Sequence, residues 1–118
     1  MTASVKRPRD YAVVPRAFGR VPNIDWHEAS LDANELMAAK IQHQQCWLIR
    51  DAIYTEFPGR QGTRLFAEAS GRDYDQVNRM LRGEITIKIY DLAAARRVLG
   101  DHIDLNVTML AATAPGQR

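Results

Sequence analysis

Residues 67–84 read AEASGRDYDQVNRMLRGE, and two glycines, Gly71 and Gly83, enclose a polar run of helical length. Glycine readily adopts the left-handed conformation that ends many helices. Asp73, just before the polar run, is a typical helix N-cap. The stretch therefore predicts a helix that ends before Gly71, a tight turn, and a second helix over 74–82 that Gly83 closes.

The apolar residues of this stretch predict how the two helices pack. Phe66 and Ala67 precede the turn, and Val77 and Met80 follow it at helical spacing. The small side chain of Ala67 lets the second helix cross close to the first, so the pair forms a helix-turn-helix pattern. The remaining side chains of the second helix are expected to face outward: Tyr74, Asp75, Gln76, Asn78, Arg79 and Arg82.

A longer helix is predicted upstream, over 34–57. Asp32, with Glu35 three residues later, resembles a capping box, and the Pro-Gly pair at 58–59 ends the pattern. The polar stretch near Gln44 leaves open a break into two helices. Two neighbouring apolar rows are expected to face the core: Met37, Ile41, Leu48 and Ala52 in one, and Ile49, Ile53 and Phe57 in the other.

Two further helices are expected downstream. Thr63 is predicted to cap the short helix before Gly71, and a fourth helical pattern runs from Thr86 to Gly100. The apolar stripe of that fourth pattern consists of Ile89, Leu92, Ala93, Val98 and Leu99. Residues 103–109 then alternate apolar and polar side chains, which is typical of a strand.

The N-terminal third has a different character. Residues 1–10 predict a disordered basic tail, and two prolines and a glycine exclude a long helix from 11–31. Residues 11–14 are expected to form a short strand or an extended arm. A strand over 103–109 needs a partner, either the same strand of a second copy or residues 11–14 of the same chain.

The run FAEASGRDYDQVNRMLRG resembles the phage-repressor, Cro-type (lambda-repressor-like) family of helix-turn-helix domains. Phe66-Ala67, Gly71, Val77 and Gly83 match, without a gap, the family's helix-two pair, turn glycine, mid-helix core residue and closing glycine. The downstream IYDLAAARRVLGDHIDL is similar to the family's fourth-helix segment. The likeness covers about residues 44–105.

Three positions depart from the family pattern. Arg72 follows the turn glycine, where an apolar residue is usual, and Arg82 replaces the usual Asn before the closing glycine. Phe66 replaces the common Leu. Two roles remain open for Arg72: it either loosens the packing of the turn or adds a cation that contacts phosphate.

The resemblance implies a mainly α fold, namely a lambda-repressor-like helix-turn-helix bundle of four to five helices. The sequence pattern outside the likeness adds the short C-terminal strand and the extended N-terminal segment. Residues 1–31 are then the basic tail and extended segment. Residues 32–105 are the helical DNA-binding domain, and residues 106–118 are the C-terminal strand and tail.

The function implied is that of a sequence-specific regulator of transcription, a phage or prophage-type repressor that binds double-stranded DNA as a homodimer. In such domains the second helix of the motif enters the major groove. The resemblance places base contacts on Tyr74, Asp75, Gln76, Asn78 and Arg79. It places phosphate contacts on Arg60, Thr63, Arg64, Arg72, Arg82 and Lys88. The basic residues Lys6, Arg7 and Arg9 are candidates for an arm in the minor groove.

Charge and composition agree with this interpretation and exclude several others. Residues 60–97 carry eight basic and five acidic side chains, an excess that attracts polyanions. No apolar run approaches the length of a membrane span, and no secretory signal is visible, so a cytoplasmic location is expected. The single cysteine, Cys46, is predicted to be buried.

No pattern of catalytic or cofactor chemistry appears in the sequence. It contains no phosphate-binding glycine loop, nucleophile elbow or metal motif, and its three histidines are far apart. We therefore expect neither an enzyme nor a cofactor, a metal or a small-molecule ligand. The alternative function is a protein-interaction adaptor or an antitoxin-like module built on the same fold.

Overall fold

The long helix α1 (Ala33–Glu56) contacts most of the other elements in the computed structural model, which describes residues 6–30 and 32–100. Asp32 caps it, because its Oδ1 accepts a hydrogen bond of 3.0 Å from the Glu35 amide. The helix is continuous, so the break considered near Gln44 is absent. No glycine or proline interrupts it, and tertiary packing supports both of its halves.

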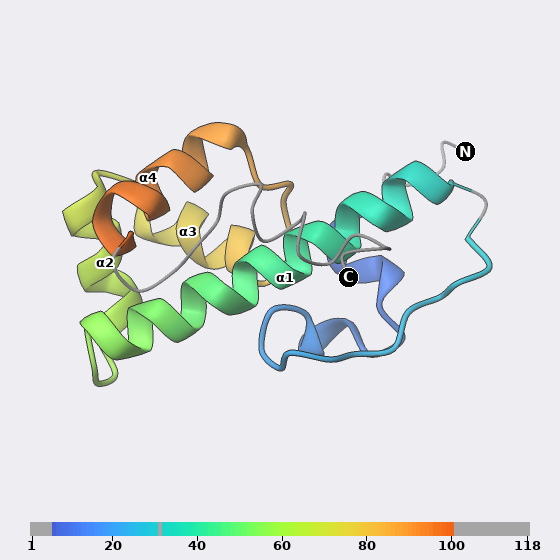
Figure 1. Cartoon of the computed structure of the whole chain (residues 1–118), viewed down its shortest axis with the longest axis horizontal. Coiled ribbons are helices and arrows are strands. Elements are labelled where there is room, and N and C mark those ends of the chain that lie inside the picture. Colours follow the sequence, from blue (N-terminus) through green and yellow to red (C-terminus); the bar gives the residue numbers. More distant parts are fainter. Residues whose placement is uncertain (1–5, 31, 101–118) are drawn as a thin grey trace, which may run out of the picture.

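Three shorter helices pack against the C-terminal half of α1: α2 (Gly62–Ser70), α3 (Tyr74–Leu81) and α4 (Ile89–Leu99). Figure 1 shows this group at one end of α1 and the N-terminal segment along the other. That segment contains two 3-10 helices, η1 (Pro8–Tyr11) and η2 (Pro15–Ala17). The described part of the chain is therefore mainly α, with four α-helices and no strand, as in a small helical bundle.

The turn between α2 and α3 has the conformation that its glycine predicts. Gly71 has a φ of +72°, and the Arg72 amide donates to the Ala67 carbonyl. Asp73 caps α3 by accepting a 3.0 Å hydrogen bond from the Gln76 amide. The cap predicted at Thr63 is wrong: Gln61 is the N-cap of α2, and Thr63 lies inside its first turn.

The end of α3 also agrees with the prediction. Arg82 is its C-cap, and Gly83 follows with a φ of +74°. The ring of Phe18 lies so close to Gly83 that an added Cβ would stand 2.6 Å from it. Glycine is therefore required there both for its backbone conformation and for the packing of Phe18.

The main core lies between α1 and the three shorter helices. It contains the four apolar residues that the motif predicted, namely Phe66, Ala67, Val77 and Met80, and the fully buried Cys46. Two predicted apolar rows need correction. Met37 and Ile41 are 54% and 39% exposed, and Ile89 of α4 is 81% exposed.

On α1, buried polar residues occupy part of the face that turns to the core, which explains why Met37 and Ile41 are exposed. Its buried face includes Gln42, His43 and Gln45 between the apolar positions Leu36, Ala39, Cys46 and Ile49. Hydrogen bonds to the backbone replace those to water for Gln42 and His43, whereas Gln45 Oε1 is buried without a partner. On α4 the buried positions are Ala95 and Leu99.

The N-terminal segment is folded where the structure describes it. Residues 8–10, expected in a disordered tail, form η1 with Tyr11, and the Arg9 amide donates to the Gly83 carbonyl at 3.0 Å. Tyr11 packs with Leu36 and Ala39 of α1 in a second, smaller core. Burial of the Tyr11 ring offsets the conformational entropy that is lost when this segment becomes ordered.

Residues 11–14 have a partner within the segment itself. Ala12 forms an isolated antiparallel bridge with Trp26, and the His27 amide donates to the Tyr11 carbonyl at 2.9 Å. Neither a strand nor a free arm forms over 11–14. The strand predicted over 103–109, and with it the pairing alternatives, lies outside the described residues.

One buried side chain of α1 fixes the loop after α3. Gln42, only 2% exposed, donates from Nε2 to the Met80 and Ile85 carbonyls at 3.1 and 2.9 Å. Its Oε1 accepts from the Ile87 amide at 2.9 Å. A single side-chain amide thus forms hydrogen bonds with three backbone groups on the two sides of Gly83, and these bonds hold the C-terminal end of α3 against α1.

Replacement of Gln42 by alanine should therefore destabilise the whole fold. The Ile85 carbonyl and the Ile87 amide lose this partner, whereas the Met80 carbonyl keeps the Gly83 amide and the Cys46 thiol as donors. We therefore expect a loss of about 2–5 kcal/mol in the free energy of unfolding. Urea denaturation of the full chain measures it. Gln44→Ala, on the exposed face of the same helix, is the control and should change stability by less than ~0.5 kcal/mol. Equal losses in the two variants would contradict this role.

His43 holds the N-terminal segment in a similar way. Its Nδ1 accepts from the Gly19 amide at 2.8 Å, and its Nε2 lies 3.2 Å from the Pro22 carbonyl. These partners require a neutral ring with its proton on Nε2. Burial lowers the pKa of His43, and the backbone carbonyls of Pro22 and Val21 oppose this only in part.

The stability of the fold should therefore decrease as the pH falls below about 6.5, the ordinary histidine value. Below that value the unfolded chain binds a proton at His43 that the folded chain resists, so acid favours unfolding. NMR titration of the folded chain should give His43 a midpoint below 6.5, and urea denaturation should show lower stability at pH 5.5 than at 7.5. His27→Gln, at an exposed position, should keep that difference. A His43 midpoint above 6.5 would contradict the assignment.

Candidate nucleic-acid interface

Helix α3 has one buried and one outward face. Val77, Met80 and Leu81 are 4% exposed or less and hold the helix on the core. The side chains predicted to contact bases lie elsewhere on it: Tyr74, Asp75, Gln76 and Arg79 are exposed and Asn78 is half-buried. The structure therefore brings the five residues together on one short helix, and four of them are exposed.

Arg64 of α2 is joined to the start of α3. Its guanidinium carbon lies 4.1 Å from the centroid of the Tyr74 ring, which is a cation–π contact. Arg64 was predicted to contact phosphate and Tyr74 to contact a base. Their contact positions a cation beside the first turn of α3.

A carboxylate organises the other end of α3. Glu84 Oε2 lies 3.2 Å from Arg82 Nε, and Glu84 Oε1 lies 3.9 Å from Arg79 Nε. Arg9 of η1 reaches the same carboxylate at 3.3 Å. Arg79 and Arg82 keep about half and two fifths of their side-chain surface exposed. The carboxylate thus orients two cations that remain accessible.

Arg72 has partners within the chain. Its Nη2 pairs with Asp91 Oδ1 of α4, and its guanidinium lies 4.8 Å from the Tyr90 ring centroid. Asp91 also accepts from the Lys88 amide at 2.9 Å and so caps α4. Arg72, predicted to contact phosphate, therefore ties the turn to the start of α4, while Lys88 itself is exposed.

The three cations of the predicted minor-groove arm also have intramolecular contacts. Lys6 lies over the Tyr11 ring, with Nζ 4.6 Å from its centroid, and Arg9 pairs with Glu84. Arg7 donates to Asp10 from Nε and Nη2 at 3.2 and 3.0 Å, and these bonds lower the pKa of Asp10. In this structure the three residues are folded against the domain and do not form a free arm.

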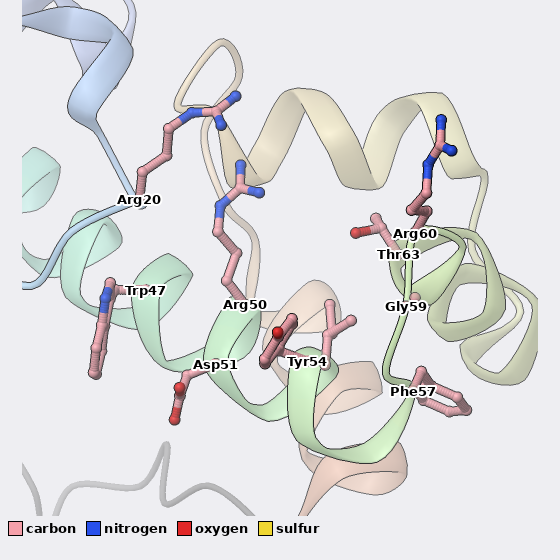
Figure 2. A pocket seen from close by; sticks show the side chains of 11 residues that line it. Arg20, Trp47, Arg50, Asp51, Tyr54, Phe57, Gly59, Arg60 and Thr63 are labelled. Carbon is pink, nitrogen blue, oxygen red and sulfur yellow. The ribbon is translucent and has the colours of Figure 1, made fainter.

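A hollow of about 320 Å³ adjoins the start of α2. Two predicted phosphate-contacting residues, Arg60 and Thr63, line it together with Arg20 and Arg50. Figure 2 shows Arg20, Arg50 and Arg60 extending toward the same side of α1, whereas Trp47 and Asp51 point away from them. The surface around the helix pair is therefore more basic than the motif alone predicted.

Sequence reasoning missed Arg20, Arg50 and Glu84. Arg20 stands in a segment expected to be extended, and 30 positions separate it from Arg50. The sequence held one weak indication of the role of Arg50. Arg50 directly follows Ile49 of a predicted core row, and a cation at such a position is partly buried. Nothing in the sequence pairs Glu84 with Arg9, since that contact depends on the fold of η1.

Three further observations on the described residues concern metal ligands, membrane-spanning helices and the one cysteine. No three metal-ligating side chains gather there, and none of the helices has the length and apolar character to cross a bilayer. Burial raises the pKa of the Cys46 thiol to about 12, so this sulfur is not a nucleophile at neutral pH.

Comparisons with protein-family models, with curated proteins and with solved structures found no match to this chain.

Proposed function

We propose that this protein is a sequence-specific regulator of transcription that binds double-stranded DNA through a helix-turn-helix formed by α2 and α3. The observation that carries the proposal is the division of α3 into two faces. Val77, Met80 and Leu81 are buried, whereas the opposite face offers Arg79 and amide, carboxylate and phenol groups. A short exposed helix of this kind, after a glycine turn, suits the major groove.

The side chains of α3 have the chemistry to distinguish base pairs. An arginine such as Arg79 donates two hydrogen bonds to guanine, and Gln76 or Asn78 pairs in the same way with adenine. Asp75 accepts from the amino group of cytosine, and it also complements the dipole at the helix N-terminus. Donors and acceptors are both present, which favours sequence readout over uniform attraction to phosphate.

Phosphate contacts would flank this helix on both sides. Arg64 and Thr63 lie in the first turn of α2, where backbone amides and the helix dipole favour an anion. Arg82 stands at the other end of α3, oriented by Glu84. Such contacts set the register of the protein on the duplex. The likeness to phage-repressor domains suggests a repressor that binds as a homodimer on paired half-sites.

An adaptor or antitoxin-like module on the same fold is the second candidate. The observation that favours it is an exposed apolar pair at the start of α4, where Ile89 is 81% and Tyr90 69% exposed. Side chains of this type are enriched where proteins meet. The pair also suits a homodimer contact, so it does not count against DNA binding.

Selection of binding sites from random duplex DNA by the full chain tests the proposal. We expect a consensus, and Arg79→Ala should cost about 1–3 kcal/mol in binding and relax one base position. Arg82→Ala should weaken binding to all sequences alike and lower the salt dependence by about one phosphate equivalent.

Two results would count against this function. Recovery of no consensus, with only weak binding at low salt, would favour the adaptor. Equal effects of the two substitutions on every sequence would show that Arg79 does not face the bases. Circular dichroism of both variants controls for folding, which should not change, since both side chains are partly exposed.

A further inference from the structure

The hollow beside α2 contains cations that lack an anionic partner. Arg20, Arg50 and Arg60 line it, and none of them forms an ion pair with a carboxylate of the described residues. The Nε of Arg50 is buried without a hydrogen-bond partner. Asp51 also lines the hollow, but Figure 2 shows its carboxylate turned away from the guanidinium groups.

The backbone holds two of these arginines in place. Arg20 follows Gly19, whose amide is bound by the buried ring of His43, and the Arg20 amide donates to the Ala17 carbonyl at 3.0 Å. Gly19 itself packs so closely that an added Cβ would lie 2.6 Å from the Leu81 carbonyl oxygen. Arg50 stands on α1 next to the buried Ile49. The cations therefore start from rigid positions.

The surroundings of Arg50 disfavour its positive charge. Burial removes part of the water around its guanidinium, and Arg20 and Arg82 add like charge, so the pKa of Arg50 lies below its ordinary value. A bound anion offsets the repulsion from Arg20 and Arg82, and it supplies the counter-charge that the half-buried guanidinium lacks. Phosphate suits the site best, since its oxygens match the planar fork of arginine donors.

We propose that the hollow lined by Arg20, Arg50 and Arg60 is a binding site for a phosphate group. Its volume of about 320 Å³ accommodates such a group, and Gly62 and Thr63 of the first turn of α2 belong to its lining. On the proposed function, the phosphate belongs to the DNA backbone next to the segment read by α3. A free phosphate or a mononucleotide offers the same chemistry.

The test compares Arg50→Gln and Arg20→Gln with Arg16→Gln, a control that removes the same charge from the exposed η2. In the first arm, the affinity of the full chain for duplex DNA is measured over a salt series. We expect the slope of log affinity against log salt to fall by about 0.9 for Arg50→Gln and Arg20→Gln, as for one lost phosphate contact. Arg16→Gln should keep the slope of the unmodified chain.

In the second arm, inorganic phosphate and adenosine monophosphate are added to the isotope-labelled chain without DNA. A free-phosphate site should shift the amide signals of Gly62 and Thr63, and Arg50→Gln should abolish these shifts. If Arg50→Gln lowers only the salt slope of DNA binding, the site holds a phosphate of the DNA backbone. If Arg50→Gln abolishes only the amide shifts, the site holds a free ligand. The second arm is informative even if the chain does not bind DNA and the proposed function fails.

The melting temperature separates ligand binding from a structural role. If Arg50 serves an anion, Arg50→Gln should leave the melting temperature unchanged or raise it in low salt, because it removes an unpartnered cation. Arg20, on an exposed loop, gives the same test should Arg50→Gln fold poorly. Unchanged salt slopes and unchanged amide shifts in both variants would overturn the proposal.

Discussion

The hydrogen bonds of the Gln42 side chain are the constraint on which the rest of this structure depends. They join the middle of the long helix α1 to the backbone at the end of α3 and in the loop after it. Because the amide group is buried, water cannot replace it. The loop in turn positions Gly83, against which Phe18 packs, and whose carbonyl accepts from the amide of Arg9. The N-terminal segment and α3 thus meet at a point that Gln42 fixes.

This constraint has a consequence for the proposed interface. Glu84 lies in the loop that Gln42 holds, and its carboxylate orients Arg79, Arg82 and Arg9. The position of these cations is therefore set by α1 and by the N-terminal segment as well as by α3. A similar dependence holds for Arg20, since the loop that carries it is bound by His43 of α1. The basic surface is a product of the whole fold.

The part of the structure that could be predicted from the sequence is the part governed by local signals. Gly71, Asp73 and Val77 act within one turn of their own position, so the limits and buried side of α3 followed from them. The burial of Gln42 and His43 could not be predicted, because their partners lie 21 to 45 positions away and a polar residue in a helix normally indicates a solvent-exposed position. The apolar residues Met37 and Ile41 were expected in the core because the polar positions of α1 were expected to face solvent. The sequence also did not indicate that Arg20 and Arg50 line one hollow, because they are far apart in the chain.

The proposed function requires that the outward face of α3 is the surface that meets DNA. Mapping of backbone amide signals by NMR, with the full chain titrated with a selected duplex, tests it most directly. We expect the largest shifts on α3, on the first turn of α2 and around Glu84, while the exposed residues Met37 and Ile41 of α1 keep their signals. Shifts confined to α1 or to the start of α4, with α3 unchanged, would contradict it.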